Sequence, residues 1–311
     1  MRVRVMLRPP RKWFPATALA LVGLGIAGLF VASAPAEADT IVWANDGGAI
    51  NGRPGPNLEE WDVNVGAATA TLLNSFAAPL VQGLGGEGIA VIGSNVYYSV
   101  FTSGNVFVTN TSGSSSGVAF STGLSGISSI ATDGRFLYLA PAATTNDIYQ
   151  YTVGGSLVST IPLIPSQVAT AIARVGLEVV GTDFVANQQQ DIGPYDKFSA
   201  AGGAPTVPQF IGSLSDFGKA GIAFDGTDYF VFDDEAQPSQ FVIYDASGVF
   251  IERVNLNACP GPNVICDIRD LSVVTAAVAE PPTLSLVAAG LIGLAMLFRR
   301  RSRSGSQNRL S

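Results

Sequence analysis

A short strand pattern that recurs at intervals of 41, 42, 50 and 49 residues is the feature that most restricts how this chain can fold. In each copy a short apolar first strand is followed by a turn and by a second strand of β-branched and aromatic residues, as in Gly88–Val91 followed by Val96–Val100. The copies centre on Ile89, Ile130, Ile172, Ile222 and Leu271. Repeats of this length with four strands each are typical of β-propeller blades.

The rest of each copy supplies two further strands. Residues 147–153 alternate as a third strand, Gly154-Gly155 forms a turn, and residues 157–161 form a fourth. In the third copy, centred on Ile172, the pattern predicts a first strand at 171–173 and a second at 177–180. Residues 187–210 read as an irregular insertion without an assignment.

The two ends of the repeat region complete one copy between them. Residues 41–45 resemble a second strand without a first, followed by third and fourth strands at 60–65 and 69–76, while Leu271–Val274 is a first strand without a second. Such a closure removes exposed sheet edges. We therefore expect an all-β chain whose residues 39–276 form a β-propeller of about five four-stranded blades, with six blades or a β-sandwich as alternatives. The order of apolar, turn and aromatic residues in these copies loosely resembles NHL-like propeller repeats. This resemblance identifies no functional residue.

The N-terminal 38 residues have the order of parts of a secretory signal peptide. Five basic residues lie among the first twelve, an apolar stretch follows from Ala16 to Ala32, and Ala36-Glu37-Ala38 supplies a small-residue cleavage step. The sequence predicts cleavage before Asp39, the alternative being an uncleaved membrane anchor.

The C-terminus carries a second apolar segment in a different setting. Residues 284–298 contain no charge, and Arg299, Arg300 and Arg301 follow directly. Fifteen residues of helix would extend about 22 Å, which is short for a membrane span. The positive-inside rule places the arginines and the tail 304–311 in the cytoplasm and the body outside.

This arrangement resembles the PEP-CTERM sorting signal, in which a Pro-Glu-Pro motif, a short apolar helix and an arginine cluster are recognised by an exosortase. The resemblance covers residues 277–303, with Ala279 in the place of the first proline. The matching residues are Glu280, Pro281, Pro282, Arg299, Arg300 and Arg301. It implies processing by signal peptidase and an exosortase-type enzyme, membrane attachment through helix 284–298 until then, and a final place at the cell surface or outside the cell. The alternative is a plain single-pass anchor.

The charge of the body restricts its partners. Residues 39–280 hold 7 basic and 23 acidic side chains, a net charge of −16. Such a surface repels nucleic acid and anionic lipid, so we expect no nucleic-acid partner.

The two cysteines lie close together in the sequence. Cys259 and Cys266 flank a Pro-Gly-Pro segment, and in an oxidising compartment we expect them to form a local disulfide. A metal or redox role is the alternative, although the chain has no histidine and the spacing is not Cys-x-x-Cys.

The absence of histidine removes Ser-His-Asp and Cys-His catalysis and every histidine-based metal centre. A weak calcium hypothesis remains, since carboxylates cluster around one predicted hairpin and Ca²⁺ prefers oxygen ligands. The candidates are Asp225, Asp228, Asp233, Asp234 and Glu235. Trp61 with Glu59, Glu60 and Asp62 could bind a sugar, though a structural aromatic residue is the favoured interpretation.

Together these features predict a non-enzymatic exported protein of the envelope or extracellular matrix, structural or adhesive in exopolysaccharide or biofilm, with no required cofactor. Two alternatives are a carbohydrate-binding propeller and a Ca²⁺-dependent propeller hydrolase or lyase.

Overall fold

The computed structural model describes residues 39–47, 57–78, 85–100, 102–114, 116–142, 145–164, 176–187, 194–212, 219–233, 238–256 and 266–275. All regular elements in these ranges are β-strands, so the all-β prediction is confirmed. No helix within these ranges is long and apolar enough to cross a membrane. The predicted signal peptide, the helix 284–298 and the tail 304–311 fall outside the described residues.

The twenty strands form five antiparallel units of four strands, which we number I to V. Unit I contains β20 (Ile268–Thr275), β1 (Thr40–Asp46), β2 (Asn57–Asn64) and β3 (Thr69–Ala77). Unit II contains β4 (Gly86–Ile92), β5 (Asn95–Val100), β6 (Asn105–Asn110) and β7 (Ser116–Ser121). Unit III contains β8 (Ile127–Thr132), β9 (Phe136–Pro141), β10 (Asp147–Thr152) and β11 (Leu157–Pro162).

Unit IV contains β12 (Leu177–Val180), β13 (Asp183–Asn187), β14 (Tyr195–Ser199) and β15 (Val207–Ile211). Unit V contains β16 (Lys219–Phe224), β17 (Asp228–Asp233), β18 (Gln240–Asp245) and β19 (Phe250–Leu256). Short parallel pairings of β19 with β3 and of β20 with β4 join units V, I and II into one 12-stranded sheet, while units III and IV are separate four-stranded sheets.

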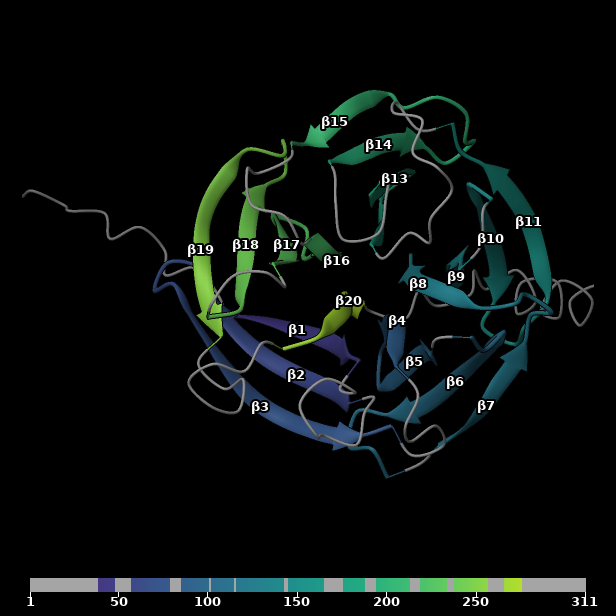
Figure 1. Cartoon of the computed structure of the whole chain (residues 1–311), viewed down its shortest axis with the longest axis horizontal. Helices are drawn as coiled ribbons and strands as arrows, with labels where there is room; N and C mark the ends of the chain where they lie inside the picture. Colours follow the sequence, from purple (N-terminus) through teal and green to yellow (C-terminus); the bar gives the residue numbers. More distant parts are fainter. Residues whose placement is uncertain are drawn as a thin grey trace, which may run out of the picture. The chain divides into compact units, whose positions relative to one another are not determined.

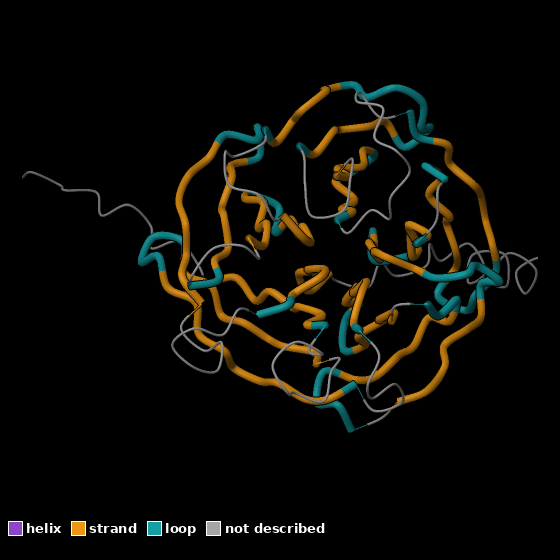
Figure 2. Tube along the Cα trace, viewed as in Figure 1, coloured by secondary structure: helices purple, strands orange, loops and turns teal. Residues whose placement is uncertain are grey.

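The first strands of the units contact one another in a closed cycle. β20 contacts β4, β4 contacts β8, β8 contacts β12, β12 contacts β16, and β16 contacts β20 again. Figure 1 shows β4, β8, β16 and β20 innermost and β3, β7, β11, β15 and β19 outermost. The strand trace in Figure 2 shows the same arrangement.

The pairing of the two chain ends in unit I is confirmed. β1 pairs antiparallel with β20, so that Val42 lies opposite Val273 and Ala44 opposite Leu271. The other edge of β1 pairs with β2, as in Val42 with Trp61. One sheet thus ties the start of the described chain to its end.

The prediction for the third copy, which corresponds to unit IV, was wrong in its strand order. Residues 177–180 form β12, the innermost strand of unit IV, and not a second strand. The second strand is β13, joined to β12 through Gly181 and Thr182. The segment read as an insertion supplies β14 and β15, so the described residues make five four-stranded units and leave no strands for a sixth. Sequence periodicity failed here because two short strands lie together within twelve residues.

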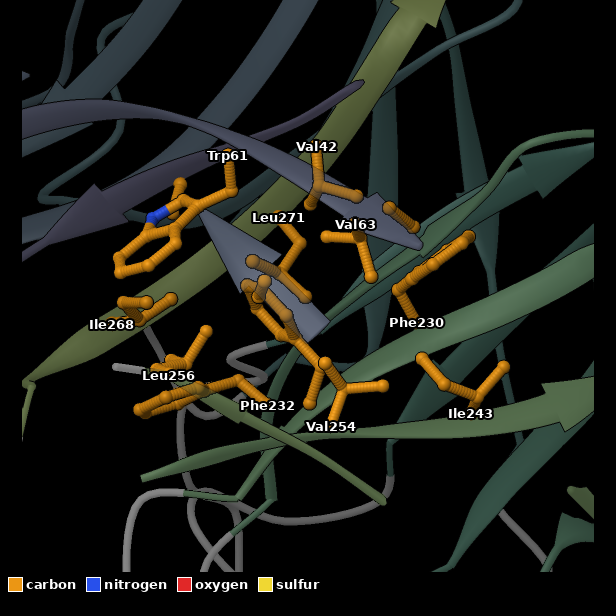
Figure 3. Close-up of a cluster of buried hydrophobic side chains, with 14 of the residues drawn as sticks. Val42, Trp61, Val63, Phe230, Phe232, Ile243, Val254, Leu256, Ile268 and Leu271 are labelled. Atoms are coloured by element: carbon orange, nitrogen blue, oxygen red, sulfur yellow. The ribbon is translucent and has the colours of Figure 1, made fainter. Parts of the chain in front are cut away.

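Five hydrophobic clusters lie between neighbouring units, one for each contact in the cycle. Successive side chains of a strand point to opposite faces. Val42 and Ala44 therefore join the cluster between units V and I, whereas Trp43 joins the cluster between I and II. Figure 3 shows the first of these clusters, with Trp61 of unit I and Phe232 of unit V among its labelled side chains. Both faces of each sheet are buried, which explains the apolar runs of the inner strands.

Candidate functional site

The most connected polar site in the described structure lies on the inner strands, around Asp270 of β20. The backbone N–H groups of Ile89 and Val91 on β4 face side chains of β20. Ile89 N donates to Asp270 Oδ2 at 3.1 Å, and Val91 N donates to Ser272 Oγ at 3.0 Å. Alternate side chains of β20 thus provide acceptors for β4 beside the short parallel pairing of the two strands, in which Val274 lies opposite Val91.

Asp270 also reaches a third unit. The same Oδ2 accepts a hydrogen bond from Ile130 N at 3.0 Å and another from Ser129 Oγ at 2.8 Å, both on β8. The side chain is completely buried. One carboxyl oxygen therefore connects units I, II and III.

Burial raises the pKa of Asp270 well above its usual value. The hydrogen bonds from Ile130, Ser129, Ile89 and Leu271 favour the charged form, yet the desolvation effect is larger. The other oxygen, Oδ1, has no hydrogen-bond partner among the described residues.

Asn45 of β1 lies directly opposite Asp270 in the strand register. Its Nδ2 donates to Gly88 O at 2.9 Å and to Ser99 O at 3.0 Å. These two acceptors fix the orientation of the amide, because only the nitrogen can donate. Its Oδ1, like that of Asp270, is buried and has no partner in the described part of the chain.

Ser99 of β5 connects unit II to unit III. Its hydroxyl accepts from Gly88 N at 2.8 Å and donates to Ile127 O at 3.0 Å. We call this set of buried residues the axial polar cluster: Asn45, Ser99, Ser129, Asp270 and Ser272.

Glycine permits the close approach of the inner strands. A Cβ on Gly88 would lie 2.5 Å from Ile130 Cγ1 and 2.7 Å from Ile130 N. At Gly221, which has a φ of +72°, a Cβ would lie 2.8 Å from the Cα of Asp270. A side chain at either position would push neighbouring inner strands apart.

A second buried carboxyl group belongs to Glu178 on β12, which is 8% exposed. It occupies the register position that small residues take in units II, III and V, namely Ala90, Ala131 and Ala223. Its Oε1 accepts from Val179 N at 2.9 Å. Burial raises its pKa to about 8, while backbone hydrogen bonds from Val179 and Phe224 act in the opposite direction.

The predicted calcium residues do not converge. Asp225 Oδ1 accepts from Thr227 N and Asp228 N, both at 2.8 Å, and its Oδ2 accepts from Thr40 Oγ1 at 2.7 Å. Asp228 and Asp233 stand at opposite ends of the six-residue strand β17, which places their Cα atoms about 17 Å apart. Asp233 pairs with Arg253 at 2.9 Å. Asp234 and Glu235 lie outside the described residues.

Trp61 is structural, as the favoured interpretation of the sequence held. Its side chain is fully buried and packs edge-on against Phe241 at a centroid distance of 6.1 Å. Its Nε1 donates to Glu59 Oε2 at 3.2 Å. Trp61 therefore offers no open face for a sugar.

The structure also groups Asp46, Glu59 and Cys266, which sequence reasoning did not connect. One ligand-type atom of each lies within 4.8 Å of the others, and all three are buried. Asp46 Oδ1 accepts from Asp267 N at 3.2 Å. A disulfide to Cys259 would remove the sulfur from this group; Cys259 lies outside the described residues, as do the six predicted sorting residues.

No family model and no curated protein matches this chain. Solved structures resemble it at low sequence identity. A chain of a nidogen/laminin complex has a TM-score of 0.48 at 10% identity, with 76% of this chain and 98% of that chain covered. A Bacteroides caccae protein of unknown function has a TM-score of 0.48 at 11% identity, covering 76% and 99%. Kuenenia stuttgartiensis hydrazine synthase has a TM-score of 0.40 at 16% identity, covering 57% and 51%.

Proposed function

We propose that this chain is an exported, non-enzymatic envelope or extracellular-matrix protein whose body is a scaffold presented at the cell surface through an exosortase-type pathway. The observation that carries the proposal is the order of its parts. A signal-peptide pattern precedes the acidic body, and a motif, an apolar segment and an arginine cluster follow it.

We further propose that the body is a five-bladed β-propeller in which units I to V are the blades. The closed cycle of contacts among the inner strands supports this, as do the five hydrophobic clusters that separate neighbouring units. Unit I then acts as a closing blade built from both chain ends, which ties the ring at a single sheet.

A scaffold role is supported by what the described carboxylates do. Asp225 caps a turn and accepts from Thr40 of unit I, Asp233 pairs with Arg253, and Asp270 connects three units. These acidic groups contribute to the architecture through hydrogen bonds and ion pairs. An adhesive role in exopolysaccharide would then rest on the outer surface of the body.

Mass spectrometry of the two termini of the mature protein tests the sorting proposal. We expect a mature N-terminus at Asp39 and a C-terminus near Glu280. A matched variant with Arg299, Arg300 and Arg301 changed to glutamine should keep the N-terminal cleavage but accumulate with its C-terminal segment intact. Recovery of the uncleaved protein from the cytosol would refute export.

The predicted disulfide is tested on the same material. Without reductant, the mature protein should be lighter by two hydrogens than the reduced form, and the peptides of Cys259 and Cys266 should be linked. Two free thiols in the exported protein would contradict the pairing.

A binding assay tests the adhesive role separately. The purified protein should cosediment with the producer's own exopolysaccharide and not with an unrelated neutral polysaccharide. Equal recovery with both would contradict a specific adhesive role while leaving the export test unaffected.

A further inference from the structure

Two buried oxygen atoms without donors lie on neighbouring residues of unit I. Asp270 Oδ1 and Asn45 Oδ1 are both inaccessible and have no partner in the described part of the chain. Their residues are direct partners across the antiparallel pair β1–β20, and such partners point to the same face with Cβ atoms about 5 Å apart. Two buried acceptors side by side are unfavourable unless a hydrogen-bond donor lies between them.

Among the groups that the structure describes, one arrangement satisfies both residues. Asn45 cannot rotate its amide, because Gly88 O and Ser99 O both require its Nδ2. Asp270 Oδ2 already accepts from Ile89, Ile130 and Ser129, so it acts as the carbonyl-like oxygen of the group. A neutral carboxylic acid carries its proton on the other oxygen, and that proton can be donated to Asn45.

We propose that Asp270 is protonated on Oδ1 in the folded protein and donates this proton to Oδ1 of Asn45, forming a buried acid–amide pair at the junction of units I, II and III. The pair makes every polar atom of the two side chains a donor or an acceptor. It also removes a negative charge from a site that water does not reach.

The charged side chains that the structure describes around β20 do not offer a counter-ion for an ionised Asp270. The elements packed against β20 carry Glu87 on β4, Asp46 on β1, and Asp228 and Asp233 on β17, while Lys219 begins β16 opposite Asp233 in the register; β20 itself carries Arg269. β8 has no charged residue. Arg269 Nη2 is 2.6 Å from Asp267 Oδ1, and the effects that shift the pKa of Asp270 are burial first and hydrogen bonds second.

A bound cation is the competing explanation, and the ligand set argues against it. Ca²⁺ takes six to eight oxygen ligands, whereas the two unpaired oxygens provide two. The hydroxyl groups of Ser99 and Ser129 are already donors to Ile127 O and to Asp270. The proton needs only the two oxygens that the structure provides.

The acid–amide pair makes the junction pH-sensitive in a defined direction. Because the folded state holds this proton more tightly than the unfolded chain, the folded state is favoured most at low pH. Its advantage falls as the pH rises above the ordinary aspartate pKa, until Asp270 also ionises in the folded protein. The pair therefore stabilises the junction of units I, II and III less as the pH rises.

Asp270→Asn in the full chain is the decisive variant, because asparagine has the shape of the neutral acid. Its oxygen can accept from Ile89, Ile130 and Ser129, and its NH₂ can donate to Asn45. In urea unfolding at pH 7 and pH 9 we expect a midpoint at or above that of the wild type, with the excess growing with pH. Asp270→Ala should lower the midpoint, since it leaves the donors of β4 and β8 without an acceptor.

The matched control is Asp245→Asn. Asp245 is an exposed carboxylate whose Oδ1 accepts from Ser247 and Val249, and these bonds lower its pKa. This variant should lower the midpoint at pH 7, the opposite direction to that expected for Asp270→Asn. If Asp270→Asn instead loses as much as Asp270→Ala, Asp270 is ionised and the proposal is wrong.

A spectroscopic measurement reads the proton directly. The infrared difference spectrum between wild type and Asp270→Asn should contain the C=O band of one protonated carboxylic acid at pH 7. The loss of an ionised carboxylate band in its place would overturn the proposal. So would one equivalent of a metal ion in the purified wild type that is absent from the variant. Both measurements remain decisive if Asp270→Ala does not fold.

Discussion

Replacing Glu178 by glutamine tests how far a buried carboxyl group makes the stability of this fold depend on pH. Glu178 lies between units IV and V with 8% of its surface exposed, and its pKa is raised from 4.5 to about 8 by burial. The folded state therefore keeps the proton over a pH range in which the unfolded chain loses it. The contribution of Glu178 to stability is therefore greatest below pH 4.5 and falls as the pH rises toward 8.

The size of the effect follows from the same values. One pKa unit corresponds to about 1.4 kcal/mol, so a rise from 4.5 to about 8 corresponds to about 5 kcal/mol of stability lost across that range. Glutamine does not ionise, and its Oε1 can still accept from Val179 N. Glu178→Gln should thus match the wild type below pH 4.5 and exceed it by up to about 5 kcal/mol above pH 8.

Urea unfolding of the full chain at several pH values measures this difference. Fluorescence of the buried Trp43 and Trp61 reports the loss of the folded state. Glu60→Gln is the control, because Glu60 on β2 is only half-buried and burial raises its pKa too; a smaller change of the same sign is expected. A Glu178→Gln variant whose stability keeps the wild-type pH dependence would refute the reasoning.

Other predictions concern the packing of the inner strands and the turns. Gly88→Ala should lower the free energy of unfolding by about 1–3 kcal/mol through overpacking against Ile130. Gly221→Ala should lower it more, because the substitution also adds strain at a positive φ. Thermal unfolding measures both variants, and a stability equal to that of the wild type would show that the inner strands can separate freely. Tyr195→Phe leaves Gly221 O without its 3.0 Å hydrogen bond and should cost about 1–2 kcal/mol, measured by urea unfolding; an unchanged midpoint would show that this bond contributes nothing. Asp245→Asn should weaken its turn with a loss that grows from low to neutral pH, since the lowered pKa favours the folded state only above that pKa; a loss that is the same at both pH values would contradict this.

Much of the strand arrangement can be predicted from the sequence because both the repeat and the turns have local causes. The hairpins of units II, III and V depend on residues such as Gly93, Gly134 and Gly226, each at a positive φ. Unit IV was misread because β12 has four residues and β13 has five, too few for a clear alternation. The assignment of these strands to one unit depends on their antiparallel pairing with β14 and β15, and sequence periodicity does not reveal that pairing.

The axial polar cluster could not be predicted in the same way, although its key residue carried a visible signal. In the five copies, the position before the central apolar residue holds Gly88, Ser129, Ala171, Gly221 and Asp270. Four of these are small, so an aspartate in the last copy departs from the pattern. Read locally, that departure suggests only a solvated turn. Its meaning depends on the closure of the cycle, which brings β20 against β4 and near β8 and encloses the carboxyl group among donors from both. A polar residue that departs from the repeat at an inner-strand position is therefore stronger evidence of a specific interaction than a cluster of acidic residues on a turn. The inner-strand residue is buried and must form its hydrogen bonds within the protein, whereas residues on a turn can be solvated.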